Sequence, residues 1–131
     1  LSSIAAAHGH ADGVIFIERV DSLALLIRHV SPDIYISSYP TGGGKAAVEA
    51  MAAGSAVVTS IGGQMLDSDP ILYDECLKFT DLAAFGDVLK QLTSMEIERQ
   101  RALSLQQFKQ KHSFQLFKQT LNDLMFELGS K

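Results

Sequence analysis

Three short apolar runs alternate with longer amphipathic segments in the first half of the chain. The runs lie at about 14–17, 33–38 and 56–60 and are rich in β-branched residues. The first, Val-Ile-Phe-Ile, is apolar at every position, which is typical of a strand buried on both faces of a sheet. Because a helical pattern separates each run from the next, the sequence predicts right-handed βαβ units. The expected fold is a Rossmann-like, three-layer α/β/α arrangement with a parallel sheet.

Start and stop signals mark the helices between these strands. Asp21 is predicted to cap a helix that Pro32 ends, and apolar residues recur between them at helical spacing. A second helix is predicted over 44–53, where Gly54 ends it. The alanine-rich segment 3–10 is a further predicted helix.

The second half of the chain predicts one more strand and a set of C-terminal helices. The segment Ile71-Leu72-Tyr73 is predicted as an edge strand, and Thr80 as the cap of the helix that follows. A polar, mostly surface helix over 94–111 comes next, and Ser113 is predicted to cap the last one, so that helices occupy about 94–129. The last helix carries an apolar stripe that is predicted to pack into the core, and its members are Phe114, Phe117, Leu121, Leu124, Met125 and Leu128.

Composition bounds the size of the protein and the partners it can take. With 131 residues, 47% of them hydrophobic, the chain is expected to form a single domain over 1–131. The formal net charge is −4, from 11 basic and 15 acidic side chains without a basic block. A nucleic acid is therefore not expected as a partner. The expected partner is a small ligand.

Two absences bear on the location of the protein. No apolar run approaches the roughly 18 residues of a membrane-spanning helix, and no signal-peptide pattern opens the chain. Cys76 is the only cysteine, which fits a reducing compartment, and its expected role is that of a small buried apolar residue. We expect a cytoplasmic protein without a transmembrane segment. Because the chain begins with Leu1 in what resembles the end of a helix, we also expect it to be a piece of something longer.

A strand end, three glycines and a compact alanine-rich helix follow one another over residues 39–54. Gly42, Gly43 and Gly44 carry no Cβ atoms, so a ligand can approach the backbone closely. The first N–H groups of the helix have no internal partners and carry about half a positive charge, which favours a phosphate there. Lys45 would oppose the helix dipole by roughly 0.3–1 kcal/mol unless an anion lies between them. The alternative interpretation is an ordinary glycine-rich turn with Lys45 in water.

Glu49 lies one helical turn beyond Lys45, so the two side chains share a face of the predicted helix. From there Glu49 can point towards whatever the glycine loop holds, and a carboxylate at that distance suits the two hydroxyls of a ribose. The same spacing also allows a simple ion pair with Lys45, worth about a few tenths of a kcal/mol. Both interpretations remain open on the sequence.

The segment from Asp33 to Val58 resembles the donor half of glycosyltransferases with the GT-B fold. In that family a small-residue loop precedes a helix ending in Glu-Ala-Met-Ala-x-Gly and then a strand Pro-Val-Val. Here 49–54 and 56–60 stand at these places. Three further segments resemble the family. Residues 14–17 with 21–23 resemble its preceding strand and helix. Ile61-Gly62-Gly63 resembles its next glycine loop, and His112-Ser113-Phe114 resembles the start of its last helix. The resemblance covers most of the chain and implies that it is half of a GT-B fold, the C-terminal half.

Site residues carry over from the family at matching positions only. The backbone groups that would hold the diphosphate of a nucleotide sugar are those of Gly43, Gly44, Lys45 and Ala46. Thr41 and Gly42 belong to the same donor-binding loop, and Glu49 would bind the ribose. The base would lie against the loop formed by Glu18, Arg19 and Val20.

The resemblance also implies what the protein does and what it needs. The donor would be a nucleotide-diphosphate sugar, a UDP-sugar first among them, with no metal and no further cofactor. The partner would be an N-terminal acceptor domain of the same parent chain, so the piece alone is expected to transfer no sugar. In the family the last helix crosses to that other domain, so part of its apolar stripe is expected to be bare here.

One departure from the pattern leaves other functions open. Retaining members with two glutamates place the first of them where Thr41 stands, so an inverting or divergent enzyme fits better. A nucleotide-sugar 2-epimerase shares the architecture and a Gly-Gly loop before a Glu-Ala helix. A non-catalytic nucleotide-binding or interaction domain of the same fold would also be consistent with the missing carboxylate.

Other polar residues suggest less. Ser37 and Ser38 at the end of a predicted strand could bond a donor sugar or their own loop. His8 and His10 stand two residues apart, which on a helix points them away from each other, and no zinc site is predicted. His112 is expected to be isolated at a helix end.

Overall fold

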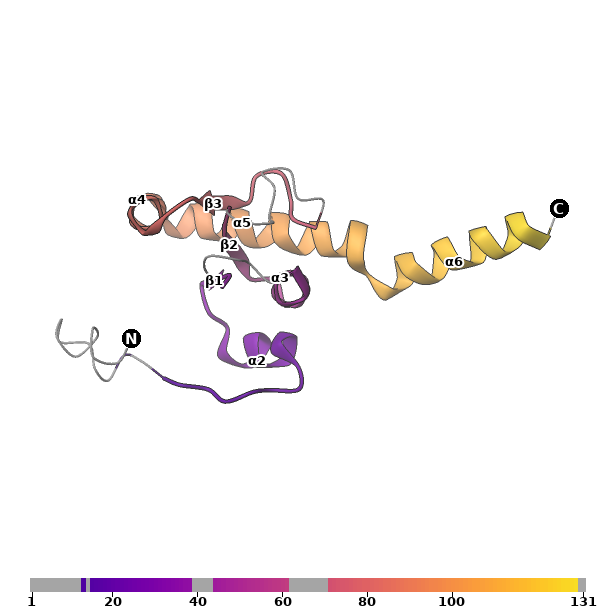
Figure 1. Cartoon of the computed structure of the whole chain (residues 1–131), viewed down its shortest axis with the longest axis horizontal. Coiled ribbons are helices and arrows are strands. Elements are labelled where there is room, and N and C mark those ends of the chain that lie inside the picture. Colours follow the sequence, from indigo (N-terminus) through magenta and orange to yellow (C-terminus); the bar gives the residue numbers. More distant parts are fainter. Residues whose placement is uncertain (1–12, 14, 39–43, 62–70, 130–131) are drawn as a thin grey trace.

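The computed structural model describes residue 13 and residues 15–38, 44–61 and 71–129, and the structural statements below concern these residues. They form a small sheet with helices around it and one helix that projects away from the body (Figure 1). The strands are β1 (Ile34–Ile36), β2 (Ala56–Ser60) and β3 (Leu77–Phe79). The helices are α2 (Leu23–Val30), α3 (Gly44–Ala52), α4 (Leu82–Gln91), α5 (Ser94–Gln107), the π-helical η2 (Phe108–His112) and α6 (Phe114–Gly129).

The sheet has the order β1-β2-β3, and both strand pairs are parallel. Tyr35 lies opposite Val57 in one pair, and Thr59 lies opposite Lys78 in the other. All five residues of the central strand β2 are buried. The α/β class and the parallel pairing of the predicted strands near 33–38 and 56–60 are thereby confirmed. The three-layer arrangement and the GT-B half remain predictions.

The core forms where helices meet the central strand. Helices α3 and α5 both pack on β2, α2 packs on α3, and α4 packs on β3. Ala47 and Ala50 lie on the buried side of α3, and their small side chains let the helix approach the strand closely. Burial of a side chain such as Met51, which is fully enclosed, stabilises the fold by roughly 1.5–3 kcal/mol. The buried core cluster comprises Ile27, Ala47, Ala50, Met51, Val57, Leu72, Tyr73 and Cys76.

Several helix ends lie where the sequence predicts them. Helix α2 ends at Val30, before Pro32, and α3 ends at Ala52, before Gly54, whose φ of 72° is the left-handed conformation that glycine adopts without strain. Ser113 caps α6 by accepting a hydrogen bond from the Leu116 amide at 3.2 Å. The predictions for two other caps are wrong by one residue. In both places two consecutive residues are able to cap the helix, and the side-chain oxygen that accepts the hydrogen bond from the first turn belongs to the second of them. Ser22 caps α2 in place of Asp21, and Asp81 caps α4 in place of Thr80.

The strand predicted at 14–17 does not form in the described residues. Ile15, Phe16 and Ile17 are extended chain outside the sheet, and their exposed fractions are 82%, 70% and 55%. β-Propensity reflects the fit of a side chain to a half-buried pleated surface, and no described neighbour provides such a surface here. Val14 and the helix predicted at 3–10 lie outside the described residues.

The predicted edge strand at 71–73 is also wrong, because the last strand is β3, at Leu77–Phe79. Leu72 and Tyr73 belong to the buried core cluster, so their apolar character serves side-chain packing and not strand pairing. The carbonyl of Leu72 accepts a hydrogen bond from Gln107 at 3.1 Å, and that of Ile71 accepts one from His112 at 2.8 Å. His112 is therefore not isolated, contrary to the prediction, but fixes this segment to η2.

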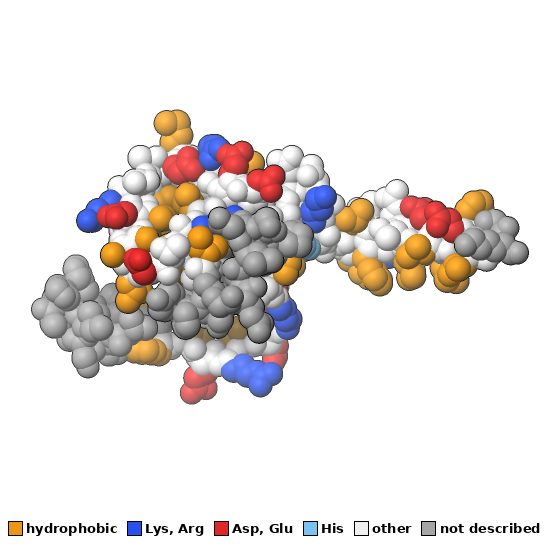
Figure 2. Space-filling view, turned by 45° about the horizontal axis from the view of Figure 1, so that its top comes forward, with side chains coloured by type: hydrophobic (Ala, Val, Ile, Leu, Met, Phe, Trp, Pro, Cys, Tyr) orange, Lys and Arg blue, Asp and Glu red, His pale blue; other side chains and the backbone are white. Residues whose placement is uncertain are grey.

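The apolar stripe of α6 does not pack into the core. No residue of α6 is buried, and the helix extends from η2 away from the body (Figure 1). Figure 2 shows hydrophobic side chains along one side of the projecting helix. The prediction of core packing is wrong here, and the expectation that part of the stripe is bare is confirmed.

Candidate functional site

Helix α3 begins at the carboxyl edge of the sheet. The chain leaves β1 at Ile36, enters α3 at Gly44 and returns to the start of β2 at Ala56. Because β1 and β2 are parallel, the N-terminus of α3 lies beyond the carboxyl ends of the strands. This is the edge at which open α/β sheets bind ligands, and the N-terminal amides of a helix there favour an anion.

The described residues at the start of α3 include one exposed charge. Lys45 is exposed, and Gly44 and Ala46 are half-buried. A Cβ atom added at Gly44 would lie 3.1 Å from Cδ1 of Ile71, so the glycine also lets that side chain approach the helix. Thr41, Gly42 and Gly43, which complete the predicted loop, lie outside the described residues.

Glu49 lies on α3, one helical turn beyond Lys45. Its side chain is half-buried, and no ion pair joins it to Lys45 among the described residues. Burial and, secondarily, the negative charge of Glu49 raise the pKa of Tyr35 on β1. The simple ion pair that the spacing allows is not formed in the described part of the chain. Sequence reasoning did not anticipate the electrostatic effect of Glu49 on Tyr35, because it depends on how α3 lies against the sheet.

The loop predicted to hold the base lies apart from this helix terminus. Glu18, Arg19 and Val20 are exposed and belong to no helix or strand. Figure 1 shows the segment before α2 running on the side of α2 that faces away from the sheet. The described structure does not bring these three residues to the start of α3, and their contact with a base remains a prediction.

Buried hydroxyl groups tie the carboxyl ends of β1 and β2 together. The Ser37 and Thr59 hydroxyls are 2.9 Å apart, and the Ser60 amide donates to Ser37 Oγ at 3.2 Å. The Ser60 hydroxyl donates to the Ser38 carbonyl at 3.2 Å. The predicted bond of Ser37 to its own loop is replaced by bonds to β2, and the role towards a donor sugar remains a prediction. These bonds fix the point from which the chain leaves the sheet towards α3.

Two arginines hold the opposite end of α3. Arg28 from α2 donates to the Ala52 carbonyl at 3.2 Å, and Arg101 from α5 donates to the Gly54 carbonyl at 3.1 Å. Cations at a helix C-terminus complement the negative end of its dipole. The two guanidinium groups thus satisfy carbonyls at the C-terminal end, while the electropositive N-terminal end points to the carboxyl edge of the sheet.

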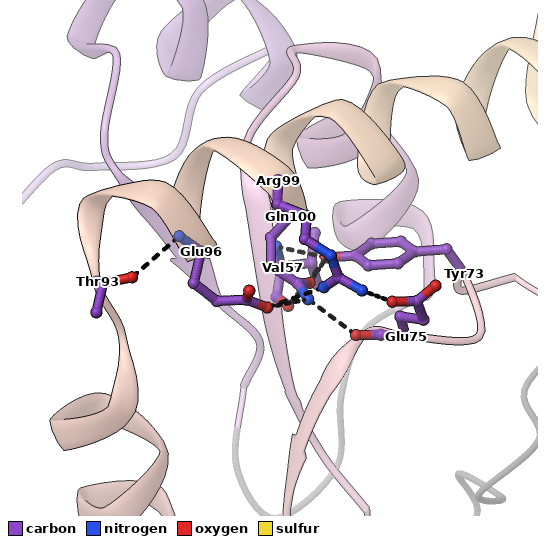
Figure 3. A network of polar contacts seen from close by, with 7 residues as sticks. All are labelled: Val57, Tyr73, Glu75, Thr93, Glu96, Arg99 and Gln100. Carbon is purple, nitrogen blue, oxygen red and sulfur yellow. Dashed lines mark hydrogen bonds and ion pairs between the residues drawn. The ribbon is translucent and has the colours of Figure 1, made fainter.

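A buried polar network fixes α5 against the sheet (Figure 3). The Tyr73 hydroxyl donates a hydrogen bond to Gln100 Oε1 at 2.6 Å and accepts one from the Val57 amide at 3.4 Å. Gln100 in turn donates to the Glu75 carbonyl and to Glu96 Oε1, each at 3.0 Å. The mostly surface character predicted for this helix is therefore wrong for Gln100, which is 1% exposed. Its polar atoms are buried because each has a partner.

Ion pairs continue this network to the surface. Arg99 pairs with Glu75 and with Glu96, the latter at 3.0 Å. Cys76 lies beside the network and donates to the Val57 carbonyl at 3.3 Å, and burial raises the pKa of its thiol to about 12. The buried apolar role predicted for Cys76 is confirmed. Such a thiol is protonated at neutral pH and is not a nucleophile.

Hollows in the described surface lie away from the start of α3. One, of about 190 Å³, opens between the segment that contains Tyr73 and the C-terminal part of α5, where glutamines line it. No group of three or more metal-ligating side chains occurs among the described residues. Within the same residues, no helix is both long and apolar enough to cross a membrane.

Comparisons with protein-family models, with curated proteins and with solved structures found no match for this chain.

Proposed function

We propose that the chain is the donor-binding domain of a glycosyltransferase of the GT-B class, which takes a nucleotide-diphosphate sugar, with UDP-sugars first among the candidates. The observation that carries the proposal is the position of α3. This helix begins at the carboxyl edge of a parallel sheet, directly after the glycine run of the sequence, with a lysine in its first turn.

In the proposed mechanism the domain stabilises the leaving group. The first amides of α3 and the Lys45 ammonium offset the charge that grows on the diphosphate as the sugar departs. Glu49 accepts hydrogen bonds from the ribose hydroxyls. The hydroxyl network around Ser37 and the two arginines at the C-terminus of α3 hold both ends of this βαβ unit in place.

Sugar transfer requires a second domain in this proposal. Donor and acceptor must be held together in a closed cleft, and positioning alone can supply roughly 7–11 kcal/mol of barrier reduction. Residues 1–131 are therefore expected to bind nucleotide weakly and to transfer nothing alone, whereas a longer parent chain that carries the acceptor domain transfers the sugar.

Nucleotide titration of the labelled chain tests the proposal. UDP is expected to shift the amide signals of residues 43–46, and Lys45→Ala to weaken binding by about 1–3 kcal/mol, the cost of a lost charged hydrogen bond. Lys90→Ala is the matched control, since Lys90 is an exposed lysine on another helix, α4. Equal binding by the two variants, or no shift at residues 43–46, contradicts the diphosphate site.

A second titration isolates the ribose. Glu49→Ala is expected to weaken the binding of UDP more than that of pyrophosphate, because only UDP has a ribose. Equal losses for the two ligands would remove this role from Glu49 while leaving the diphosphate site intact.

A non-catalytic domain of the same fold is the second candidate, favoured by Thr41 at the position of a family glutamate. Such a domain would still bind UDP through α3. Absence of sugar transfer by the longer parent chain, together with retained UDP binding, would favour it.

A further inference from the structure

Helix α6 presents a regular apolar surface that no described element covers. Its principal contact with the rest of the described chain is with η2 at its start. The side chains concerned are exposed by fractions from 46% at Leu121 to 72% at Phe114. We name as the apolar seam the five residues Phe114, Phe117, Leu121, Leu124 and Leu128.

The spacing of the apolar seam is that of a coiled coil. Successive members stand three, four, three and four residues apart, which is the pattern of the a and d positions of a heptad. The seam therefore fits one neighbouring helix with the same spacing. Met125 at an e position widens it, and Phe126 is a further exposed apolar residue of the helix.

Charge is distributed unevenly along this part of the chain. Lys109, Lys111 and His112 lie just before α6, and Lys118 lies in its first half. The second half carries two exposed acidic residues, Asp123 and Glu127. Two parallel copies would place like charges together, whereas two antiparallel copies bring the basic end of each helix beside the acidic end of the other.

We propose that the apolar seam of α6 binds the same seam of a second copy of this chain, with the two helices antiparallel. In that arrangement Phe114 faces Leu124 of the second copy and Phe117 faces its Leu121, so aromatic residues pack against aliphatic ones. The projection of α6 from the body leaves the two bodies at opposite ends of the paired helices (Figure 1). This interface does not involve the donor site at the start of α3. In the longer parent chain of the proposed function, the acceptor domain would compete with the second copy for the same helix.

The exposed area is adequate for such a pair. At roughly 200 Å² for a fully exposed large side chain, Met125 and the four seam residues from Phe114 to Leu124 leave about 600 Å² accessible on each copy. Two copies can thus bury up to about 1,200 Å² there, at the lower end of the ~1,200–2,000 Å² of specific interfaces. A membrane surface is a poorer partner, because the polar side of α6 carries acidic as well as basic residues and anionic lipids favour a basic one.

Sedimentation equilibrium with a matched pair of variants tests the interface. The 14.2 kDa chain is expected to approach twice that mass as its concentration rises towards about 1 mM. Leu121→Asp puts a charge at the centre of the seam of both copies and is expected to weaken dimerisation more than about 30-fold. Phe126→Asp, at an exposed apolar position outside the seam, is expected to change dimerisation less than about threefold. Circular dichroism checks that both variants keep the fold of the wild type.

A chain that stays monomeric to about 1 mM, or equal effects of the two substitutions, overturns the proposal. So does binding of the monomer to phosphatidylcholine–phosphatidylglycerol vesicles that Leu121→Asp abolishes, without dimer formation.

Disulfide crosslinking tests the orientation. Because Cys76 is buried, a cysteine introduced into α6 is the reactive one. A mixture of Phe117→Cys and Leu121→Cys chains is expected to form crosslinked dimers under oxidation faster than either chain alone. Faster crosslinking within each single variant would mean parallel helices and overturn the proposed arrangement.

Discussion

The Tyr73 hydroxyl is the centre of the buried network, and its removal gives a direct measure of what that network contributes. Tyr73→Phe keeps the ring, which belongs to the core cluster, and deletes only the oxygen that bonds Gln100 at 2.6 Å and Val57 at 3.4 Å. Gln100 Oε1 then loses this partner inside the protein. A buried polar atom left unsatisfied costs about 1–3 kcal/mol, so we expect a loss of about 2 kcal/mol in the free energy of unfolding.

Urea and thermal denaturation measure this loss. For a domain of this size about 2 kcal/mol lowers Tm by about 6–10 °C. Tyr35→Phe is the matched control, since among the described residues no hydrogen bond of the Tyr35 hydroxyl is present, and it should change stability by less than about 0.5 kcal/mol. A double-mutant cycle with Gln100→Leu should give a coupling energy of about 1–2 kcal/mol. Equal losses in Tyr73→Phe and Tyr35→Phe would refute the assignment of stability to the hydrogen bond.

Three further predictions follow from single residues. The pKa of Cys76 is about 12 in the fold against an ordinary 9.0, so the unfolded chain releases this proton first and stability should fall as pH rises from about 9 towards 12. Urea titrations between pH 8 and pH 10.5 should show the decline in the wild type and a shallower one in Cys76→Ala; identical slopes would contradict it. Gly54→Ala should lower the free energy of unfolding by about 1 kcal/mol, because the φ of Gly54 is 72°. Gly86→Ala, inside α4, should raise it by about 0.5–1 kcal/mol. A change of the same sign in both variants would contradict the conformational argument. Gly44→Val should abolish UDP binding while costing less than about 2 kcal/mol in stability, since the nearest atom is the mobile end of Ile71; a binding curve like that of the wild type would exclude a phosphate at this amide.

Much of the sheet and most of the helices were predictable because local signals decide them. Pro32 and Gly54 end helices through the conformations their backbones permit, and Ser113 caps one through its own oxygen. The parallel pairing of β1 and β2 follows from the helical segment between them. Such features depend on residues close together in sequence.

The features that could not be predicted from the sequence depend on residues that are far apart along the chain. The apolar runs at 14–17 and 71–73 have the composition of strands, but only their surroundings decide whether they pair, pack or remain exposed. Gln100 resembles a surface residue until Tyr73 and Glu75 are placed beside it. At the candidate site, Lys45 and Glu49 were foreseeable from helical spacing, whereas the electrostatic effect of Glu49 on Tyr35 depends on the packing of α3 against the sheet.

The hydrogen bonds that α5 makes also determine when this domain can complete its folding during synthesis. Tyr73 accepts a hydrogen bond from the Val57 amide on the central strand and donates one to Gln100 on α5. The carbonyl of Gly54, which follows α3, accepts a hydrogen bond from Arg101 on α5. Arg101 emerges from the ribosome 47 residues after Gly54, and Gln100 emerges 27 residues after Tyr73. A nascent chain that stops before α5 would hold an incomplete core with buried polar groups unpaired, and contacts of such long sequence separation form late. Folding of the central strand is therefore expected to await nearly the whole body of the protein, and translation pauses before residue 94 would leave it exposed to chaperones and proteases.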